Sequence, residues 1–108
     1  MTTVVLKKKD NRYSGLLLTG HAGYADSGQD IVCSAISILV INSINAMETL
    51  AGERMEMTAD EREGRIAVSF PDAVNEKSQL ILDTMVLGLK SVQEQYGKKY
   101  LKLKFEEV

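Results

Sequence analysis

The sequence contains no tryptophan, one proline, one histidine (His21) and one cysteine (Cys33). A single cysteine cannot form an intramolecular disulfide, which excludes the small secreted domains that depend on such bonds. A lone thiol suits a reducing compartment, so we expect a cytoplasmic protein. One cysteine and one histidine with scattered carboxylates also fall short of a zinc site, which needs three or four ligands. We therefore predict neither a metal nor another cofactor.

The chain also has little net charge, −2 at neutral pH. A nucleic-acid-binding domain normally carries a clear excess of Lys and Arg on one face. The two short basic runs, residues 7–9 and 98–99, are typical of solvated strand edges or turns. Direct binding to nucleic acid is therefore not predicted.

Long hydrophobic runs are missing as well. The longest nearly apolar run, residues 31–41, is too short to span a bilayer and contains Ser34 and Ser37. The first seven residues show no charged segment followed by an apolar stretch, the pattern of a signal peptide. We expect neither a membrane partner nor a cleaved leader.

The 108 residues present are enough for one compact domain and too few for two, so we expect a single domain over residues 1–108. Apolar periodicity and turn residues predict the element order ββαββαβ. The predicted strands are residues 2–9, 13–19, 53–58, 65–70 and 100–106, and the predicted helices are residues 30–51 and 71–96. Adjacent hairpins favour an α+β fold, an antiparallel or mixed sheet with two main helices packed on it. Both helices are apolar over more than one stripe, although packing on a sheet requires only one, which hints at a second subunit.

Cys33 follows a glycine-containing loop and lies in the first turn of a predicted helix whose N-cap is Asp30. Amide N–H groups without intrahelical partners surround that turn, and their partial positive charge favours a thiolate. They would also be suitably placed to stabilise an oxyanion. The thiolate is the nucleophilic form of cysteine. The competing interpretation is that Cys33, with Ile31, Val32 and Ile36 nearby, is an ordinary core residue.

His21 ends the second predicted strand and opens the loop, so it should lie near the start of the following helix. An imidazole there could accept the thiol proton and pass it to a leaving amine, although a lone histidine is more often a surface or capping residue. Gly20, Gly23 and Gly28 permit tight turns and close backbone approach to a ligand, or a plain surface loop. Asp30 either caps the helix, which we favour, or orients the imidazole. Tyr24 with Ile31, Val32 and Ile36 could line an apolar pocket, or be a surface tyrosine and helix core.

The segment from Gly20-His21-Ala22 through Gly28 to Asp30-Ile31-Val32-Cys33, with Ala35 and Ser37 following, resembles the ribosomal-processing cysteine protease family (Prp). The likeness extends over the whole chain in length and element order, but its specific part is residues 20–37. Ser34 stands where the family often has alanine, and a small residue is kept.

This resemblance implies a cysteine endopeptidase that removes a short N-terminal extension from a large-subunit ribosomal protein in Firmicutes and some related bacteria. It implies a homodimer, His21 and Cys33 as a catalytic dyad, and a mobile glycine loop that corresponds to residues 20–29. It also implies cleavage after a pair of aromatic residues. Two rival interpretations stay open: a ribosome-associated binding module without catalysis, and a thiol-dependent acyl hydrolase or acyl transferase.

Overall fold

The computed structural model describes residues 1–26 and 29–108 and contains a five-stranded sheet with two helices. The elements are β1 (Thr2–Lys9), β2 (Arg12–Thr19), α1 (Ile31–Leu50), β3 (Glu56–Asp60), β4 (Arg65–Ser69), α2 (Glu76–Tyr96) and β5 (Leu101–Glu107). The strand order is β3-β4-β2-β1-β5. Only β1 and β5 are parallel, and the other neighbours are antiparallel. The predicted α+β fold and element order are confirmed, and the sheet is mixed.

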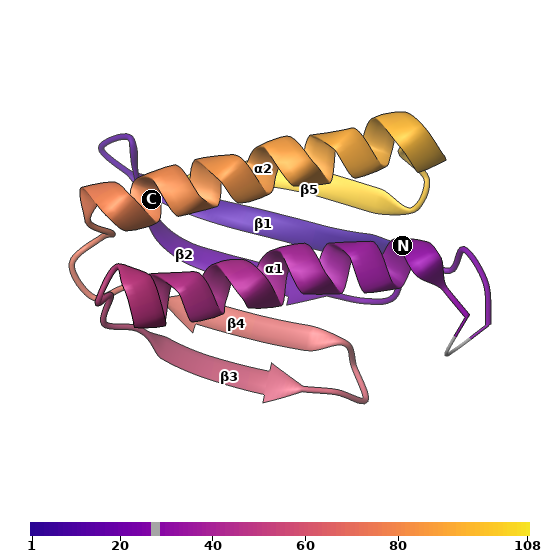
Figure 1. Ribbon diagram of the computed structural model, residues 1–108, viewed down its shortest axis with the longest axis horizontal. Coiled ribbons are helices and arrows are strands. Elements are labelled where there is room, and N and C mark those ends of the chain that lie inside the picture. Colours follow the sequence, from indigo (N-terminus) through magenta and orange to yellow (C-terminus); the bar gives the residue numbers. More distant parts are fainter. Residues whose placement is uncertain (27–28) are drawn as a thin grey trace.

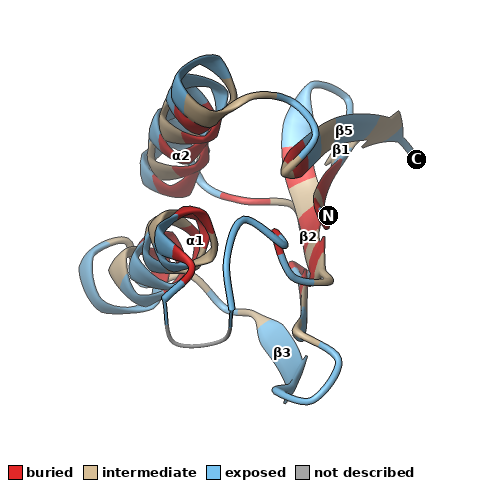
Figure 2. Ribbon diagram, turned by 90° about the vertical axis from the view of Figure 1, so that its right-hand side faces the viewer, coloured by how far each residue is buried: buried red, intermediate tan, exposed pale blue. Residues whose placement is uncertain are grey.

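The two helices lie side by side across one face of the sheet, and β3 is at the edge below α1 (Figure 1). A side view shows a helix layer and a sheet layer, with the buried residues between them (Figure 2). Each helix contributes one buried stripe to this core. The buried stripes are Val32, Ile36, Val40, Ser43, Ile44 and Met47 in α1, and Ser78, Leu82, Met85, Val86, Leu89 and Val92 in α2.

Tyr13 is the largest fully buried side chain and ties β2 to α2. Its hydroxyl donates a hydrogen bond of 2.6 Å to Asp83 Oδ1. Burial raises the pKa of Tyr13, and the Asp83 carboxylate raises it further by accepting this hydrogen bond and by its charge. The phenol therefore stays protonated and acts as a donor throughout the range in which the protein can be handled.

The second helix begins later than predicted. We expected it to open at Pro71-Asp72, but its N-cap is Asn75, whose side chain accepts a hydrogen bond from the Ser78 N–H. The intervening residues are held by β2, because the Val74 N–H bonds the Tyr13 carbonyl and the Arg12 side chain bonds the Val74 carbonyl. These tertiary hydrogen bonds outweigh the local preference for helix that an initial proline suggests.

The third strand is also shifted from the predicted residues 53–58 to Glu56–Asp60. Glu53 is instead used at the end of α1, where its N–H bonds the Met47 carbonyl and its carboxylate accepts from the Asn75 N–H. The whole of β3 is exposed, and among the described strands β4 is its only neighbour. Strand β3 therefore offers a free backbone edge next to α1.

Helix α1 has the length and mean hydropathy, 1.7 over its most apolar window, that a membrane span would need. A core helix passes the same test, and the buried stripe of α1 packs on the sheet. Our expectation, based on residues 31–41 alone, underestimated the length over which this helix is apolar. Its high hydropathy comes from apolar side chains on the outer face in addition to those in the core, as Ile38 is 63% exposed.

Candidate active site

A groove of about 400 Å³ runs between α1 and the β3–β4 hairpin, and both His21 and Cys33 line it. Its other lining residues are Leu18, Gly20, Ser37, Ile41, Ile44, Asn45, Met57, Ala59, Asp60, Glu61, Gly64, Arg65 and Ile66. The structure thus brings the only histidine and the only cysteine of the chain to one concave surface. A thiol and an imidazole on a shared groove are the two groups that thiol-based acyl transfer requires.

Cys33 is the third residue of α1 and is half-buried. Its backbone N–H donates to Asp30 Oδ1 at 2.9 Å, and the Ser34 N–H bonds the Asp30 carbonyl at 3.0 Å. The two amides closest to the sulfur are therefore already occupied. This modifies our expectation of free oxyanion donors at the helix start, because using these two amides would break the helix cap.

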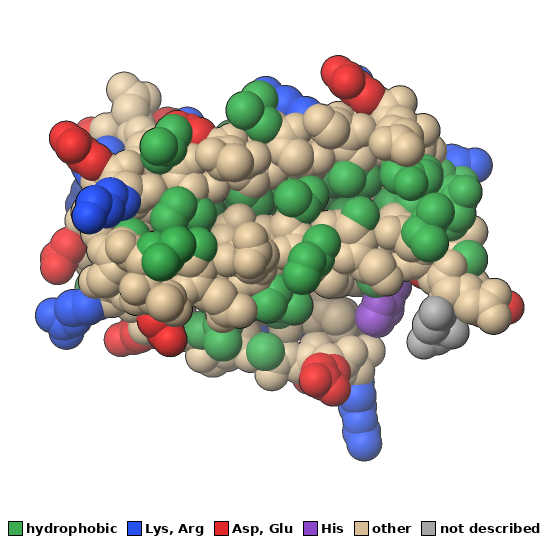
Figure 3. Space-filling view, in the orientation of Figure 1, with side chains coloured by type: hydrophobic (Ala, Val, Ile, Leu, Met, Phe, Trp, Pro, Cys, Tyr) green, Lys and Arg blue, Asp and Glu red, His purple; other side chains and the backbone are tan. Residues whose placement is uncertain are grey.

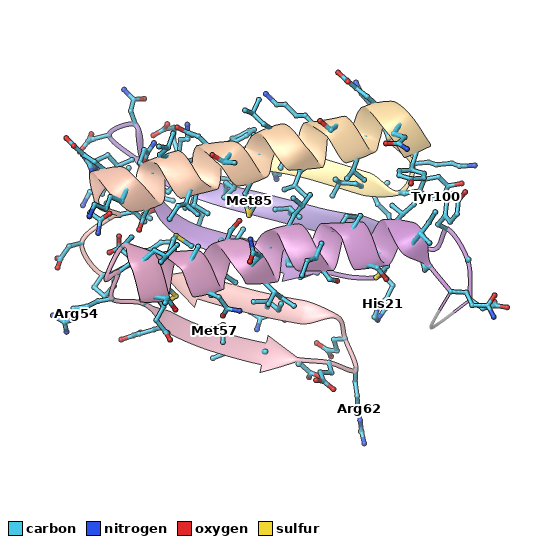
Figure 4. The ribbon with its side chains drawn as sticks, viewed as in Figure 1. His21, Arg54, Met57, Arg62, Met85 and Tyr100 are labelled. Carbon is cyan, nitrogen blue, oxygen red and sulfur yellow. The ribbon has the colours of Figure 1, made fainter. Side chains whose placement is uncertain are left out.

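His21 lies just beyond the end of β2, between a half-buried glycine with a left-handed backbone and a buried alanine. Gly20 before it has a φ of +84°, and Ala22 after it is only 3% exposed. The imidazole itself is exposed and projects beneath the first turns of α1, toward the side of the β3–β4 hairpin (Figure 4). The side chain is thus open to a substrate while its backbone is anchored on both sides.

Asp30 joins the loop to the helix. One carboxylate oxygen caps α1 by accepting from Cys33, and the other accepts from the Tyr24 N–H at 3.0 Å. Burial by itself raises the pKa of Asp30, but backbone hydrogen bonds from Cys33, Tyr24, Ala25 and Val32 outweigh it, so the pKa is lowered. The predicted N-cap is confirmed. With both oxygens bound to backbone donors, Asp30 acts as a clamp between the two segments that carry His21 and Cys33.

This second hydrogen bond changes what we expect from Asp30→Asn. Asparagine caps helices about as well as aspartate, which alone would make the substitution nearly neutral. Here the amide has one acceptor where the carboxylate has two, so its NH₂ group would face a backbone N–H. We expect a loss of about 1–3 kcal/mol in the free energy of unfolding at neutral pH, measured by thermal and urea unfolding.

The pH dependence of that loss provides a control. A lowered folded-state pKa stabilises the protein above the ordinary carboxyl value of 3.8, and this contribution is lost as the pH falls through the folded-state value. The difference between wild type and Asp30→Asn should therefore shrink in acid. Asp72→Asn, at an exposed position, removes the same charge and should change little. Equal stability of Asp30→Asn and wild type at neutral pH would contradict the clamp.

The remaining loop residues lie in different surroundings. Gly23 has a φ of +75° and open space around its Cα, whereas Gly28 lies outside the described residues. Tyr24 packs edge-on against Tyr96 and Tyr100, with ring centroids 5.6 and 5.2 Å away. The loop is therefore fastened to the C-terminal end of α2 and the start of β5 through Tyr24.

The apolar lining of the groove does not come from the residues we expected. Val32 and Ile36 are fully buried in the core, and Ile31 is 52% exposed. The apolar wall instead consists of Leu18, Ile41, Ile44, Met57 and Ile66. Positions 37, 41 and 45 follow Cys33 at intervals of four, so helical spacing alone could have placed them on its face. Nothing in the local sequence indicated that the hairpin would form the opposite wall.

Among the residues that the structure describes, no group of three or more His, Cys, Asp or Glu side chains is placed to hold a metal ion. The candidate site therefore consists of a thiol, an imidazole, a backbone-bonded carboxylate and an apolar groove.

Comparison with known proteins gives matches to one family over most of the chain. The family model described as cysteine protease Prp matches residues 1–102. Ribosomal processing cysteine protease Prp of Staphylococcus aureus (strain Mu50) is 30% identical over 97 residues, which cover 90% of this chain and 92% of that protein. The Bacillus subtilis (strain 168) protein of the same name is 31% identical over 83 residues, covering 73% and 74%. The crystal structure of the S. aureus protease with a covalently linked product peptide superposes with a TM-score of 0.90 at 31% identity, covering 98% of this chain and 100% of that one.

Proposed function

This chain belongs to the cysteine protease Prp family, and from that membership we propose that residues 1–108 form one cytoplasmic cysteine-endopeptidase domain with His21 and Cys33 as its dyad. The proposed substrate is the short N-terminal extension of a large-subunit ribosomal protein. The observation that carries the proposal is the position of His21 and Cys33 on one groove. The S. aureus relative was solved with a covalently linked product peptide, which agrees with a nucleophilic side chain.

In the proposed first step, Cys33 attacks the peptide. The His21 imidazole accepts the Sγ proton, and the sulfur forms a bond to the scissile carbonyl carbon while the carbonyl π electrons move to oxygen. The carbonyl then re-forms as the C–N bond breaks, and the imidazolium gives its proton to the leaving amine. The products of this step are a thioester on Cys33 and the shortened partner protein.

In the second step, water releases the acyl group. His21 removes a proton from water, the oxygen adds to the thioester carbonyl, and collapse expels the Cys33 thiolate. Because the Val32, Cys33 and Ser34 amides bond Asp30, we propose that backbone N–H groups of the preceding loop that do not bond Asp30 stabilise the oxyanion.

The groove has dimensions that suit a short extended peptide. From Cys33 to Asn45 helix α1 advances about 18 Å, which matches about five residues of extended chain. The free edge of β3 could pair with the peptide backbone, while the apolar wall accepts side chains. This arrangement supports the preference for aromatic residues before the cut that the family resemblance implies.

A peptide series tests this substrate proposal. Burying one phenylalanine side chain is worth roughly 1.5–3 kcal/mol, so replacing both aromatics before the scissile bond by alanine should lower kcat/KM about a hundredfold or more. An acyl thioester without peptide character should react poorly. Ile41 lines the groove, so Ile41→Ala should reduce the difference in kcat/KM between the aromatic peptide and the double-alanine peptide. Leu50 is exposed elsewhere on α1, so Leu50→Ala should leave this difference unchanged.

A different result would redirect the assignment. If the double alanine peptide retains kcat/KM within threefold, the groove does not select aromatic side chains. If the thioester is the better substrate, the chain is an acyl hydrolase.

We also propose that the protein is a homodimer through the outer helix face, defined here as Ile31, Ile38, Leu80 and Leu87. These side chains are 52%, 63%, 68% and 68% exposed. Hydrophobic side chains gather along both helices on the face turned away from the sheet (Figure 3). Exposed apolar patches of this kind on a small protein mark contact surfaces. A second copy is the partner that the family resemblance implies.

Sedimentation at micromolar concentration should therefore give about twice the chain mass of 11.9 kDa. Leu87→Glu would bury a charge in the proposed interface and should shift the protein to monomer. Leu50→Glu adds the same charge at a position that is 74% exposed and outside this face, so it should stay dimeric. A monomeric wild type throughout the micromolar range would refute the dimer.

A further inference from the structure

The turn of the β3–β4 hairpin makes an unusually close approach to His21. Gly64 occupies this turn with a φ of +59°. A Cβ added there would lie 2.7 Å from the Gly20 carbonyl oxygen, 3.0 Å from His21 Cε1 and 3.1 Å from His21 Nε2. Only a residue without a side chain allows the hairpin backbone to press against the edge of the imidazole.

The backbone before His21 is confined from the other direction as well. A Cβ at Gly20 would lie 2.5 Å from the Met1 carbonyl oxygen. Gly20 is thus enclosed by the start of β1 on one side and by Gly64 on the other, and Ala22 beyond His21 is buried. Two segments that are distant in the sequence, the start of β1 and the β3–β4 turn, therefore confine the backbone from which the His21 side chain projects.

The turn that carries Gly64 is itself well defined. Asp60 Oδ1 accepts from the Arg62 N–H at 3.0 Å and the Glu63 N–H at 3.4 Å, and the Gly64 N–H bonds the Glu61 carbonyl. Asp60 and Arg65 form the last register pair of the hairpin before this turn. The backbone that lies against the imidazole is therefore held in place by hydrogen bonds within the turn.

We propose that Gly64 is a positioning residue for His21: the hairpin backbone at Gly64 restrains the imidazole in its place on the groove that it shares with Cys33. This inference rests on the proposed role of His21 as general base. In triad enzymes a carboxylate orients the histidine, but here both oxygens of Asp30 bind backbone N–H groups. Contact with Gly64 supplies the restraint in place of a third polar side chain.

Gly64→Ala is the first test, with Gly52→Ala as its matched control. Gly52 has nearly the same φ, +62°, but no atom lies within 4 Å of an added Cβ. Both variants carry the strain of a left-handed alanine, so both should lose some thermal stability. Only Gly64→Ala should lower kcat, by about tenfold to a hundredfold, as expected for a displaced catalytic group. KM should stay within about twofold.

Gly64→Asn covers the case in which Gly64→Ala does not fold. Asparagine tolerates a left-handed backbone better than alanine does, but it retains the Cβ. Its kcat should therefore fall as in Gly64→Ala while its melting temperature stays closer to wild type. A kcat within twofold of wild type in either folded variant would overturn the proposal.

A spectroscopic readout separates this inference from the proposed function. His21 is the only histidine, so its Cε1–H signal is unambiguous in NMR spectra. Wild type should show a nuclear Overhauser contact between that proton and the Gly64 Cα protons, and Gly64→Asn should weaken it. Absence of the contact in wild type would overturn the inference. Full activity of His21→Ala would instead refute His21 as base, whatever the spectra show.

Discussion

Cys33→Ala is expected to abolish peptide cleavage while the protein remains folded. Without Sγ no thioester can form, and losing a nucleophile costs on the order of 10⁴–10⁶-fold in kcat when the rest of the site is intact. Cys33 is half-buried, so truncating its side chain should cost little stability. Steady-state kinetics on the aromatic peptide and a thermal melt measure both quantities.

Two further measurements sharpen this prediction. Cys33 is the only cysteine, so iodoacetamide should add one carbamidomethyl group to the intact mass and inactivate the enzyme in parallel. Ser34→Ala changes the adjacent exposed residue of the same helical turn and should retain activity. Undiminished turnover in Cys33→Ala would show that the peptide is cleaved without this thiol, so that Cys33 is not the nucleophile.

His21→Ala has the second largest expected effect, a fall of about 10²–10⁴-fold in kcat/KM. The imidazole is exposed, so its removal should leave the melting temperature nearly unchanged. Alkylation of Cys33 by iodoacetamide should also slow, because the base that takes the thiol proton is missing. Kinetics, melting and alkylation rates can be measured on one preparation.

The interpretation of His21→Ala depends on agreement among these readouts. A loss of activity with an intact melting temperature and slower alkylation identifies a catalytic loss. A fall of less than tenfold in kcat/KM would remove His21 from the role of general base.

The sequence predicted the elements that local patterns determine and missed those that distant contacts determine. The Asp30 cap and the end of α1 before Gly52 are local features, and both are correct. The predicted start of α2 was wrong because Arg12 and Tyr13, far away in the sequence, hold Val74 and the residues just before it out of the helix. Local propensity contains no information about such hydrogen bonds.

The site shows the same division. The spacing between His21 and Cys33 predicted that a strand end and a helix start would bring them to one region, and they share a groove. The opposite wall of that groove belongs to β3 and β4, whose position depends on the pairing of β4 with β2. The second hydrogen bond of Asp30 was likewise unpredictable, because it depends on the path of the loop at Tyr24.

The parallel pairing of β1 with β5 has a consequence for how the molecule is assembled. Thr2 pairs with Leu101, so this contact closes a loop that contains every other element. Long-range contacts of this kind slow folding, because the entropy of closure is lost before the contact forms. During synthesis β1 emerges before all other elements and β5 after them. The Tyr24 ring also packs against Tyr100, the residue just before β5. The sheet, and with it the support of the His21 loop, can therefore be completed only after β5 has left the ribosome.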